Sequence, residues 1–280
     1  MNGGVDCTLI KHIISMGNKN LNIILLSCTK FGGDLANKLI KNGYTFSCIF
    51  STPIDFDISY SEKPVKNYNF FNFNEFCKTH SIKYYEVNKA TGQTLSTYNN
   101  IIKELEPDII LVLGWYYMVP KKIRDLAKKG AWGIHASLLP NYAGGAPLVW
   151  AIISGEKETG VTLFQLSDGV DDGNIIEQRK FSITELDSIS SVYKKATKAS
   201  ELVLIKAMKN FDSVKFHPQD KGSIKVYPQR APSDGEINLN LSAKEMYDFV
   251  RAQSSPYPGA FIKTVDNKKL IIEKARIEDI

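Results

Sequence analysis

The chain has 280 residues and a mass of 31.4 kDa, enough for one large domain or a large domain with a small appendage. Hydrophobic residues make up 43% and charged residues 23%, values typical of a globular protein, which exclude disorder, collagen-like repeats and coiled coils. The net charge of +5 is spread along the chain, so it permits a phosphate-bearing partner without requiring one. No apolar run reaches the roughly 18–20 residues of a membrane span.

The cysteines and the first twenty residues bear on the cellular compartment. Cys7, Cys28, Cys48 and Cys77 form no CxxC pair, which fits a reducing compartment. Residues 1–20 lack the basic start, apolar stretch and cleavage site of a signal peptide, and we interpret them as a loosely ordered N-terminal extension. The sequence therefore predicts a cytoplasmic protein.

The first half of the chain alternates strands and helices. Residues 22–27 form a continuous apolar run, typical of a strand buried on both faces of a parallel sheet. The pair Gly32-Gly33 predicts a turn, followed by a helix over 34–42 and a strand over 45–50, the order of a βαβ unit. Further predicted elements are a loop over 51–69, a helix over 73–80, a strand over 83–87, a helix over 98–105, a buried strand over 108–113, a helix over 121–129 and a strand over 131–136.

The second half begins with a Gly- and Pro-rich loop and ends in a region of different composition. The predicted elements up to residue 209 are a loop over 137–147, a short helix over 149–153, strands over 160–166 and 174–183, and a long helix after Ser188. Three prolines follow, then a helix over 242–252 and strands over 260–265 and 269–274. We therefore predict an α/β fold: a Rossmann-like, mostly parallel sheet over 21–210, followed by a small C-terminal α+β or open-barrel domain over 211–280.

His135 has the setting of a chemical group. It ends a predicted strand, and ligands of open α/β sheets bind beyond the carboxyl ends of the strands. The segment 168–173, Asp-Gly-Val-Asp-Asp-Gly, is typical of a hairpin turn when taken alone. Taken with His135, its carboxylates offer an acid–base partner on a neighbouring loop. No His or Cys set has metal-ligand spacing, so we predict no metal site.

These residues belong to a longer pattern. The pattern comprises His-Ala-Ser-Leu-Leu-Pro at 135–140, Gly144, Ala146-Pro147, Trp150-Ala151-Ile152, Thr159-Gly160-Val161-Thr162 and Val170-Asp171-Asp172-Gly173. It resembles the folate-dependent formyltransferase family, which includes glycinamide ribonucleotide transformylase, methionyl-tRNA formyltransferase and the nucleotide-sugar N-formyltransferases. The tail, with Tyr227-Pro228, Arg230, Asp234-Gly235 and Pro256–Phe261, is most similar to the short C-terminal domain of the nucleotide-sugar enzymes.

The resemblance implies a transferase that moves a formyl group from N10-formyltetrahydrofolate to the primary amine of a nucleotide-linked amino sugar. Negative charge develops on the formyl oxygen and the attacking amine loses a proton, so the site needs a hydrogen-bond donor and a base. The family's catalytic His maps to His135, as oxyanion donor or proton shuttle. Its Asp maps to Asp171, which sets the protonation and orientation of the histidine, and Asp172 is a weaker candidate.

The resemblance also suggests which residues contact the two ligands. The folate is expected between the segment Gly114, Trp115, Tyr116, Tyr117 and Met118 and the loop residues Val170, Asp172 and Gly173. The residues expected near the amine acceptor are Ser137, Tyr142, Trp150 and Gln165. The glycines after the first strand lack the GxGxxG spacing of a dinucleotide site.

The sequence departs from the family pattern at the residue two before the histidine. The family has Asn there, as the third catalytic residue, and this chain has Gly133, which offers no side-chain donor. Three hypotheses stay open: Ser137 or a water molecule substitutes for the Asn, the site is weakened, or the protein binds its ligands without catalysis. In the following loop, Asn141 and Ala143 replace residues that are often basic in the family, which puts a charge contact in doubt.

Two alternatives to the sugar-modifying enzyme stay open. Methionyl-tRNA formyltransferase is the alternative within the family, but the short C-terminal domain and the dispersed Lys and Arg residues argue against a nucleic-acid face. The other alternative is a non-catalytic folate- or nucleotide-sugar-binding protein, which Gly133 keeps open. The Pro-Tyr-Pro segment 256–258 and the apolar strands near it are candidates for a homodimer interface.

Overall fold

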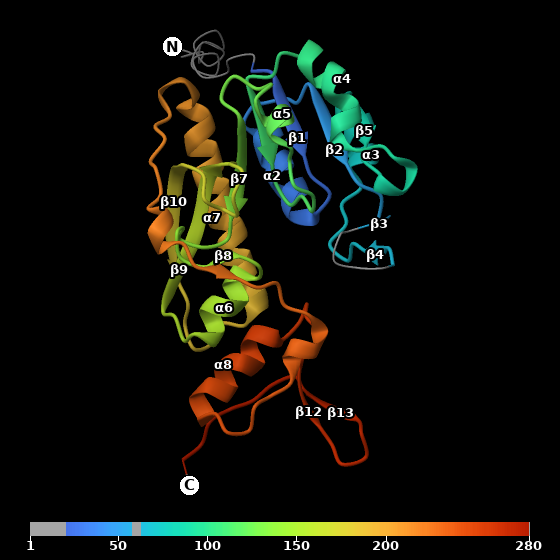
Figure 1. The fold of residues 1–280 in the computed structure, drawn as a ribbon. Coiled ribbons are helices and arrows are strands. Elements are labelled where there is room, and N and C mark those ends of the chain that lie inside the picture. The colour runs from blue at the N-terminus through green and yellow to red at the C-terminus, as the bar shows by residue number, and fades with distance from the viewer. Residues whose placement is uncertain (1–20, 58–62, 280) are drawn as a thin grey trace, which may run out of the picture. The chain divides into compact units, whose positions relative to one another are not determined.

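A computed structural model describes residues 21–57 and 63–279 (Figure 1). The predicted N-terminal extension lies outside the described residues. The chain divides into two compact units: the first reaches to Gly133 and includes Ile205–Val214, and the second comprises Ile134–Leu204 and the chain from Lys215 onward. The domain boundary that the sequence predicts near residue 211 stays a prediction. No helix in the described ranges is long and apolar enough to cross a membrane.

Parallel strand pairs build the sheet. β1 (Ile23–Leu26) pairs with β2 (Cys48–Ser51) and β6 (Ile109–Val112), β2 also pairs with β5 (Lys83–Glu86), and β6 also pairs with β7 (Ala131–His135). All four side chains of β1 are fully buried, as its apolar run predicts. With the antiparallel pair β9 (Glu158–Gln165) and β10 (Ile175–Ser182), the sheet has seven strands in the order β10-β9-β7-β6-β1-β2-β5. The predicted α/β class with a mostly parallel sheet is confirmed.

The first helix begins earlier than its sequence suggests. α2 (Lys30–Lys41) starts after Thr29, whose hydroxyl accepts a hydrogen bond from the amide of Gly32. Gly32 and Gly33 therefore lie inside the helix, and the predicted turn is wrong. A Cβ at position 32 would come within 1.8 Å of the Ser27 hydroxyl oxygen and 2.3 Å of the Leu113 carbonyl oxygen. Glycine stands there because the helix passes close to two strand ends, and not because the chain turns.

Two other segments of the first unit differ in the structure from what the sequence predicts. The predicted helix over 121–129 ends at Arg124, because the amides of Lys128 and Lys129 donate to the carbonyls of Pro107 and Asp108 instead of continuing the helix. The predicted loop over 51–69 contains a small antiparallel pair of strands. The bounds of the remaining elements here are β3 (Asp55–Phe56), β4 (Val65–Lys66), α3 (Phe73–His80), α4 (Asn99–Glu104) and α5 (Lys121–Arg124).

The second unit holds the remaining helices and two short strand pairings. β8 (Ala143–Gly144) pairs in parallel with β11 (Val226–Tyr227), and β12 (Ala260–Lys263) forms an antiparallel hairpin with β13 (Lys269–Ile272). Its helices are α6 (Pro147–Ile153), α8 (Ala243–Gln253) and most of α7 (Ile189–Lys209). The predicted helix and hairpin of the C-terminal region are present. The role of that hairpin in a homodimer stays a prediction.

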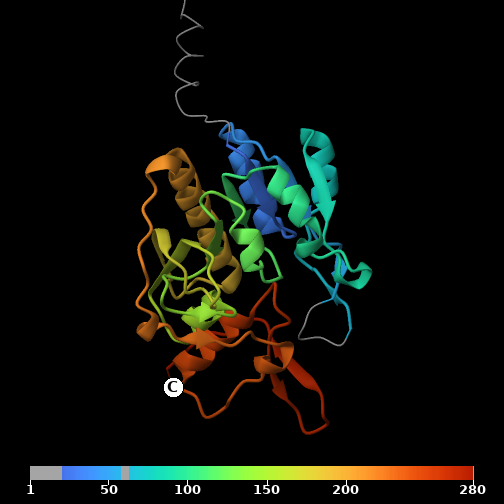
Figure 2. The ribbon, with the colours of Figure 1, turned by 45° about the horizontal axis from the view of Figure 1, so that its top comes forward.

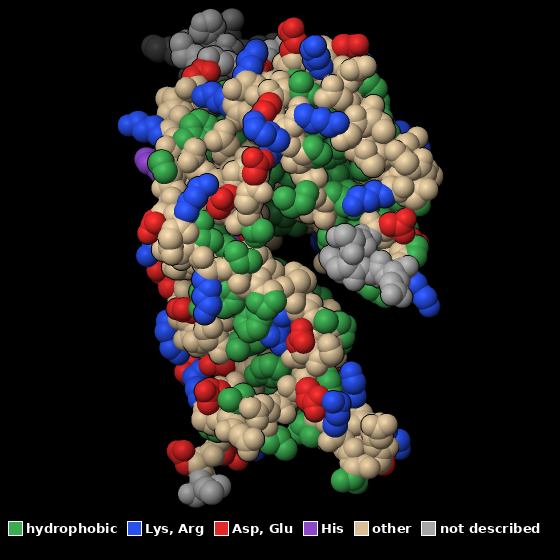
Figure 3. Space-filling model, in the orientation of Figure 1, with side chains coloured by type: hydrophobic (Ala, Val, Ile, Leu, Met, Phe, Trp, Pro, Cys, Tyr) green, Lys and Arg blue, Asp and Glu red, His purple; other side chains and the backbone are tan. Residues whose placement is uncertain are grey.

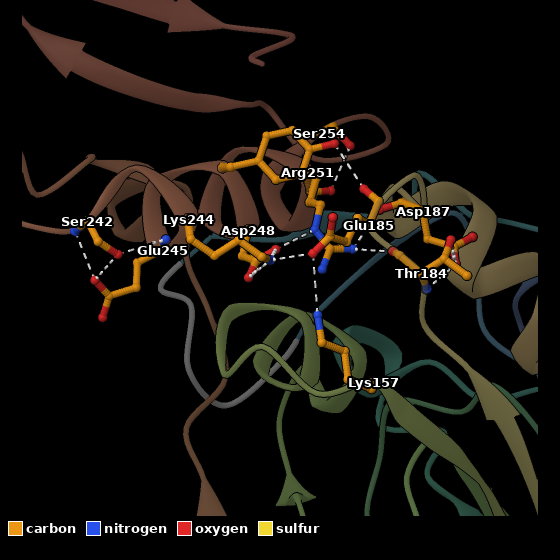
Figure 4. Close-up of polar contacts among 11 residues, drawn as sticks. Lys157, Thr184, Glu185, Asp187, Ser242, Lys244, Glu245, Asp248, Arg251 and Ser254 are labelled. Carbon is orange, nitrogen blue, oxygen red and sulfur yellow. Dashed lines mark hydrogen bonds and ion pairs between the residues drawn. The ribbon is translucent and has the colours of Figure 1, made fainter. Parts of the chain in front are cut away.

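Buried charges attach α8 to the connection between β10 and α7 (Figure 4). The guanidinium of Arg251 donates to the Asp248 carboxylate at 2.7 Å and to the carbonyls of Thr184 and Asp187 at 3.1 and 2.8 Å. Lys244 reaches the same Asp248 carboxylate at 2.7 Å. Asp248 and Arg251 are both buried, so these hydrogen bonds replace the water that the charges have lost. The C-terminal helix is thereby tied to the body of its own unit.

Candidate active site

His135 is buried at the carboxyl end of β7, with both ring nitrogens near oxygen atoms. Its Nε2 lies 2.7 Å from the carbonyl oxygen of Tyr142. Its Nδ1 lies 3.4 Å from Oδ2 of Asp171. Only 10% of the histidine side chain and 20% of the aspartate side chain are exposed, so the pair is largely shielded from water. The structure therefore brings together the two residues that the sequence offers as the catalytic pair.

Asp171 lies in the connection between β9 and β10, and its backbone has a φ of +52°. This left-handed conformation is uncommon for a residue other than glycine and needs support from its surroundings. Part of that support comes from Gly144, whose amide donates to Oδ2 of Asp171 at 2.8 Å. The same carboxylate oxygen thus faces the His135 ring and accepts a backbone hydrogen bond, which defines its direction.

The two contacts of His135 limit what its ring can do. A neutral imidazole has one donor and one acceptor nitrogen, whereas a protonated ring donates from both. The oxygens of Tyr142 and Asp171 both accept hydrogen bonds, so a protonated ring satisfies both contacts and a neutral ring satisfies one. Catalysis by His135 therefore requires that one of these contacts be exchanged for a contact with the reacting group.

The loop after His135 is held by hydrogen bonds to its backbone. Thr162 on β9 donates to the carbonyl of Ser137 at 2.7 Å and accepts from the amide of Leu139 at 3.1 Å. The fully buried Ser137 hydroxyl donates to the carbonyl of Asn141 at 2.6 Å. To act as the substitute donor for the missing Asn, Ser137 must turn away from Asn141. Gly133 itself lies within β7, in register with Val112.

Asp172 and Val170 differ from their neighbour Asp171 in their surroundings. The hydroxyl of Ser167 donates to the Asp172 carboxylate, and Lys221 forms an ion pair with it at 3.3 Å. These contacts hold the pKa of Asp172 below its usual range. Asp172 is thus committed to Ser167 and Lys221, and Asp171 is the carboxylate that faces the histidine. Val170 is about half exposed.

Gln165 and Gly173 lie close to each other at the end of the β9–β10 hairpin. The backbone amide of Gln165 donates to the backbone carbonyl of Asn174 at 2.8 Å. The side-chain amide of Asn174 donates to the side-chain oxygen of Gln165 at 3.4 Å. A Cβ at Gly173 would come within 1.7 Å of the Gln165 carbonyl oxygen. Both residues therefore shape the turn of the β9–β10 hairpin, and ligand contacts for them stay a prediction.

Tyr142 and Trp150 lie together with a third aromatic residue that the sequence did not single out as part of the site, Tyr227. The Tyr227 ring centroid is 4.9 Å from that of Tyr142 and 5.6 Å from that of Trp150. The guanidinium of Arg230 lies 4.7 Å from the Trp150 ring centroid, and Lys225 lies 5.2 Å from that of Tyr227. We call Tyr142, Trp150 and Tyr227 the aromatic cluster. Since the carbonyl of Tyr142 also contacts His135, the aromatic cluster adjoins the His135–Asp171 pair.

Tyr142 has polar contacts as well as ring contacts. Its hydroxyl donates to the Glu156 carboxylate at 2.7 Å. Burial raises the pKa of Tyr142 to about 12, and the nearby Glu156 carboxylate adds to this rise. Tyr142 is therefore a neutral phenol at physiological pH, and it offers a ring face and not a base.

The segment 114–118, expected near the folate, lies in the first unit after β6. Trp115 has a buried ring N–H with no hydrogen-bond partner among the described residues. The Tyr116 ring stacks on Phe56 with centroids 4.9 Å apart, and Met118 is 72% exposed. An unpaired buried donor is costly unless a ligand or water accepts from it. The Trp115 N–H is thus available to an acceptor group of a ligand.

Tyr117 and Gly114 complete this segment. The Tyr117 hydroxyl donates to the carbonyl of Asp57 at 2.9 Å, and Lys89 lies 4.3 Å from the centroid of its ring. Burial raises the pKa of Tyr117 to about 12. Gly114 has a φ of +67° at the point where the chain leaves β6. Tyr117 thus fixes the segment through its hydrogen bond to Asp57, and Gly114 allows the left-handed backbone at its start.

The charges on the surface do not gather by sign on the face drawn in Figure 3. Lys and Arg side chains alternate with Asp and Glu side chains along that face. Within the described ranges, no group of three or more His, Cys, Asp or Glu residues is placed to hold a metal ion.

The fold and the His135–Asp171 pair agree with the class that the motifs resemble, the formyl transferases. The formyl transferase domain matches residues 23–208, and the C-terminal domain of formyl transferases matches residues 230–280. The chain belongs to the formyl transferase family. The resemblance identified from the sequence motifs is confirmed.

Individual relatives include a protein named for polymyxin resistance. The bifunctional polymyxin resistance protein ArnA of Wigglesworthia glossinidia brevipalpis is 38% identical over 178 residues, which are 63% of this chain and 27% of that protein. This chain therefore spans about a quarter of the length of that relative.

Solved structures with the same fold include sugar N-formyltransferases. One from a Shewanella species superposes with a TM-score of 0.67 at 16% identity, covering 94% of this chain and all of that one. The N-formyltransferase of Helicobacter canadensis, in complex with folinic acid and dTDP-3-aminofucose, superposes with a TM-score of 0.64 at 20% identity, covering 83% of this chain and 80% of that one. At such identities the likeness concerns the fold.

Proposed function

We propose that this protein transfers a formyl group from N10-formyltetrahydrofolate to the primary amine of a nucleotide-linked amino sugar. The observation that carries the proposal is the buried contact between His135 Nδ1 and Asp171 Oδ2, at 3.4 Å, at the carboxyl end of β7. A carboxylate in this position orients the imidazole and stabilises its protonated form, as acid–base catalysis requires.

The reaction asks two things of the protein. As the amine nitrogen bonds to the formyl carbon, negative charge grows on the formyl oxygen and the amine gives up a proton. His135 meets these needs by donating a hydrogen bond to that oxygen or by moving the proton. Asp171 compensates the positive charge of the protonated ring, and the amide of Gly144 keeps the Asp171 carboxylate in place.

Folate chemistry supplies an activated formyl group carried on nitrogen. We assign contacts to the folate to the segment 114–118, where the unpaired ring N–H of Trp115 suits a polar edge and the exposed Met118 suits an apolar face. Val170, Asp172 and Gly173 are proposed for the same ligand. The Helicobacter canadensis relative was crystallised with folinic acid, which supports a folate donor for this chain.

The aromatic cluster supports a nucleotide-linked acceptor. Flat aromatic rings stack on nucleobases, and cations close to them attract phosphate groups. Tyr142, Trp150 and Tyr227 supply the rings, while Lys225 and Arg230 supply the cations. The dTDP-linked amino sugar in the Helicobacter canadensis structure supports the same class of acceptor.

Product analysis by mass spectrometry tests the function. The purified protein is incubated with N10-formyltetrahydrofolate and a panel of amino sugars linked to uridine, thymidine or guanosine diphosphate. We expect one acceptor to gain a formyl group. We expect His135→Ala to abolish the product while the variant still binds folate, and we expect His217→Ala, a matched change at an exposed histidine, to retain activity.

The other outcomes distinguish the alternatives. Formylation of methionyl-tRNA, with affinity that falls steeply as salt rises, would replace the sugar acceptor with tRNA. Calorimetric binding of folate and a nucleotide sugar without any product would make the protein a binding module, with Gly133 as the reason. Full activity in His135→Ala would overturn the role of the histidine.

A further inference from the structure

The segment from Lys215 to Tyr227, which we call the linker, lies against the β9–β10 hairpin that carries Asp171 and against the loop that follows His135. His217 forms two backbone hydrogen bonds of 2.8 Å with Ile175, at the start of β10. Further along, Val226 and Tyr227 form β11, which pairs with β8, so that Tyr227 lies opposite Gly144. The orange segment beside β10 and below β8 in Figures 1 and 2 shows this course.

One linker side chain reaches the backbone of the aspartate loop. The side-chain amide of Gln219 donates to the carbonyl of Asp171 at 2.8 Å and to the carbonyl of Gly173 at 2.6 Å. The two N–H groups of this one amide thus bind the carbonyls of the residues before and after Asp172. The side-chain oxygen of Gln219 is buried and has no hydrogen-bond partner among the described residues. The hydrogen bonds that the Gln219 side chain forms are therefore the two that it donates.

These bonds act where the backbone needs support. Asp171 has a φ of +52°, a conformation that persists only when neighbouring groups hold it. Its side chain is held by the Gly144 amide, and its carbonyl is held by Gln219. The nearby ion pair of Lys221 with Asp172 offers less, because the Lys221 side chain is 73% exposed and such pairs contribute little.

We propose that Gln219 is a positioning residue that keeps the Asp171 carboxylate aimed at His135. The proposal rests on the proposed function, because it assigns Gln219 a part in the same reaction. Gln219 acts through Asp171 and does not touch the reacting atoms. The linker thus carries a determinant of catalysis as well as joining the two parts of the chain that match the family.

Two substitutions of nearly equal size test the proposal. Gln219→Met removes both donors and adds no charge, while Gln219→Glu sets a carboxylate against the two carbonyl oxygens. We expect kcat to fall by about 10-fold to 100-fold in both, as for a misplaced catalytic group. We expect the KM for the acceptor and the melting temperature to change little. His217→Ala is the matched control, because its linker contacts are made by the backbone and remain.

Hydrogen exchange supplies a readout that does not depend on activity. The Gly144 amide donates to Asp171, so its exchange reports whether the carboxylate stays in place. In both Gln219 variants we expect exchange in peptides that contain Gly144 to quicken by up to about tenfold, the effect of losing a net hydrogen bond. The His217→Ala control should exchange like the wild type.

Each contrary result has a separate meaning. Wild-type kcat with wild-type exchange in Gln219→Met overturns the proposal. A loss of activity that only follows the unfolded fraction, with kcat per folded molecule unchanged, makes Gln219 a structural residue and also overturns it. If the wild type transfers no formyl group to any acceptor, the proposed function fails, and faster exchange at Gly144 in the variants still supports the positioning of Asp171.

Discussion

The backbone of Gly144 lies directly against that of Tyr227. The two residues are partners in the parallel pairing of β8 with β11, and a Cβ on Gly144 would come within 2.5 Å of the Tyr227 carbonyl oxygen. Gly144 also has a φ of +91° and donates its amide to Asp171. Gly144, a residue without a side chain, thus both allows the close approach of the linker and holds the Asp171 carboxylate.

Gly144→Ala should destabilise the protein by about 2–4 kcal/mol, because it adds a backbone clash to an unfavourable φ. Gly92→Ala is the control: it has a φ of +75° with no atom within 4 Å of the new Cβ, so it should cost about 1 kcal/mol. Urea denaturation of both variants measures the difference. Equal losses of stability in the two variants would show that the close contact with Tyr227 does not add to the cost of a Cβ at position 144.

Asp171→Asn should lower kcat by about 10²–10⁴-fold. The amide keeps an oxygen for the Gly144 N–H but removes the negative charge that faces His135, so the fold should persist. Steady-state kinetics and thermal melting check both statements. Asp220→Asn in the linker is the control, because either side chain caps the Gly222 amide there. Unchanged kcat in Asp171→Asn would remove Asp171 from the mechanism.

Gly133→Asn tests what replaces the missing family residue. Alternate residues of a strand point to the same side, so an Asn at position 133 would stand on the His135 side of β7. If Ser137 or a water molecule already serves, kcat should not rise and acceptor binding should weaken. A gain approaching 10²–10³-fold, the usual worth of an oxyanion donor, would show that the natural site is impaired.

Substitutions in the aromatic cluster should act on the acceptor. Trp150→Leu and Tyr227→Leu each remove a ring, and we expect the KM for the nucleotide sugar to rise about tenfold while the KM for the folate stays the same. Tyr68→Leu is the control, since that side chain is 90% exposed. Initial rates over a range of acceptor concentrations provide the measurement. An unchanged acceptor KM in both variants would place the nucleotide elsewhere.

Asp187 should make stability depend on pH below about pH 4. Burial alone would raise the pKa of this carboxyl, but hydrogen bonds from Lys195, Thr184 and Ser191 lower it well below its usual range. Because the folded pKa is depressed, Asp187 stabilises the fold above the unfolded value near 4, and this contribution is lost as the pH falls further.

Asp187→Asn should therefore cost about 2–4 kcal/mol at pH 7, and the difference from the wild type should narrow between pH 4 and pH 2. Chemical denaturation at a series of pH values provides the test. Asp34→Asn, which breaks an exposed pair with Lys30 at 3.5 Å, is the control and should cost well under 1 kcal/mol. A difference that does not vary with pH would contradict the ionic role of Asp187.

The fold was largely predictable because its strands carry strong local signals. The apolar runs at β1 and β6 report burial on both faces, and the Ser242–Glu245 capping box marks the start of α8. The start of α2 was not predictable, because Gly32 is explained by the close approach of Ser27 and not by any turn. Local propensity does not report such tertiary proximity.

In the candidate site, too, some residues were predictable from the sequence and others were not. His135 and Asp171 were identifiable because their motifs resemble a family, and the structure places them 3.4 Å apart. Gln219 was not identifiable, since a side chain that bonds to backbone carbonyls leaves no periodicity or composition signal. The pairing of β8 with β11 is only two residues long, too short for a strand pattern, and so the position of Tyr227 beside Tyr142 was missed.

The course of the linker also determines when, during synthesis, the surroundings of His135 and Asp171 can be completed. A ribosome makes the chain from its N-terminus, so His135 and Asp171 emerge well before Gln219 and Tyr227. Until the linker has followed them out, the loop of Asp171 lacks the amide of Gln219 and β8 lacks its partner strand. In a nascent chain that stops short of the linker, the residues of the parallel strands have been made, but the loop of Asp171 and β8 still lack these contacts.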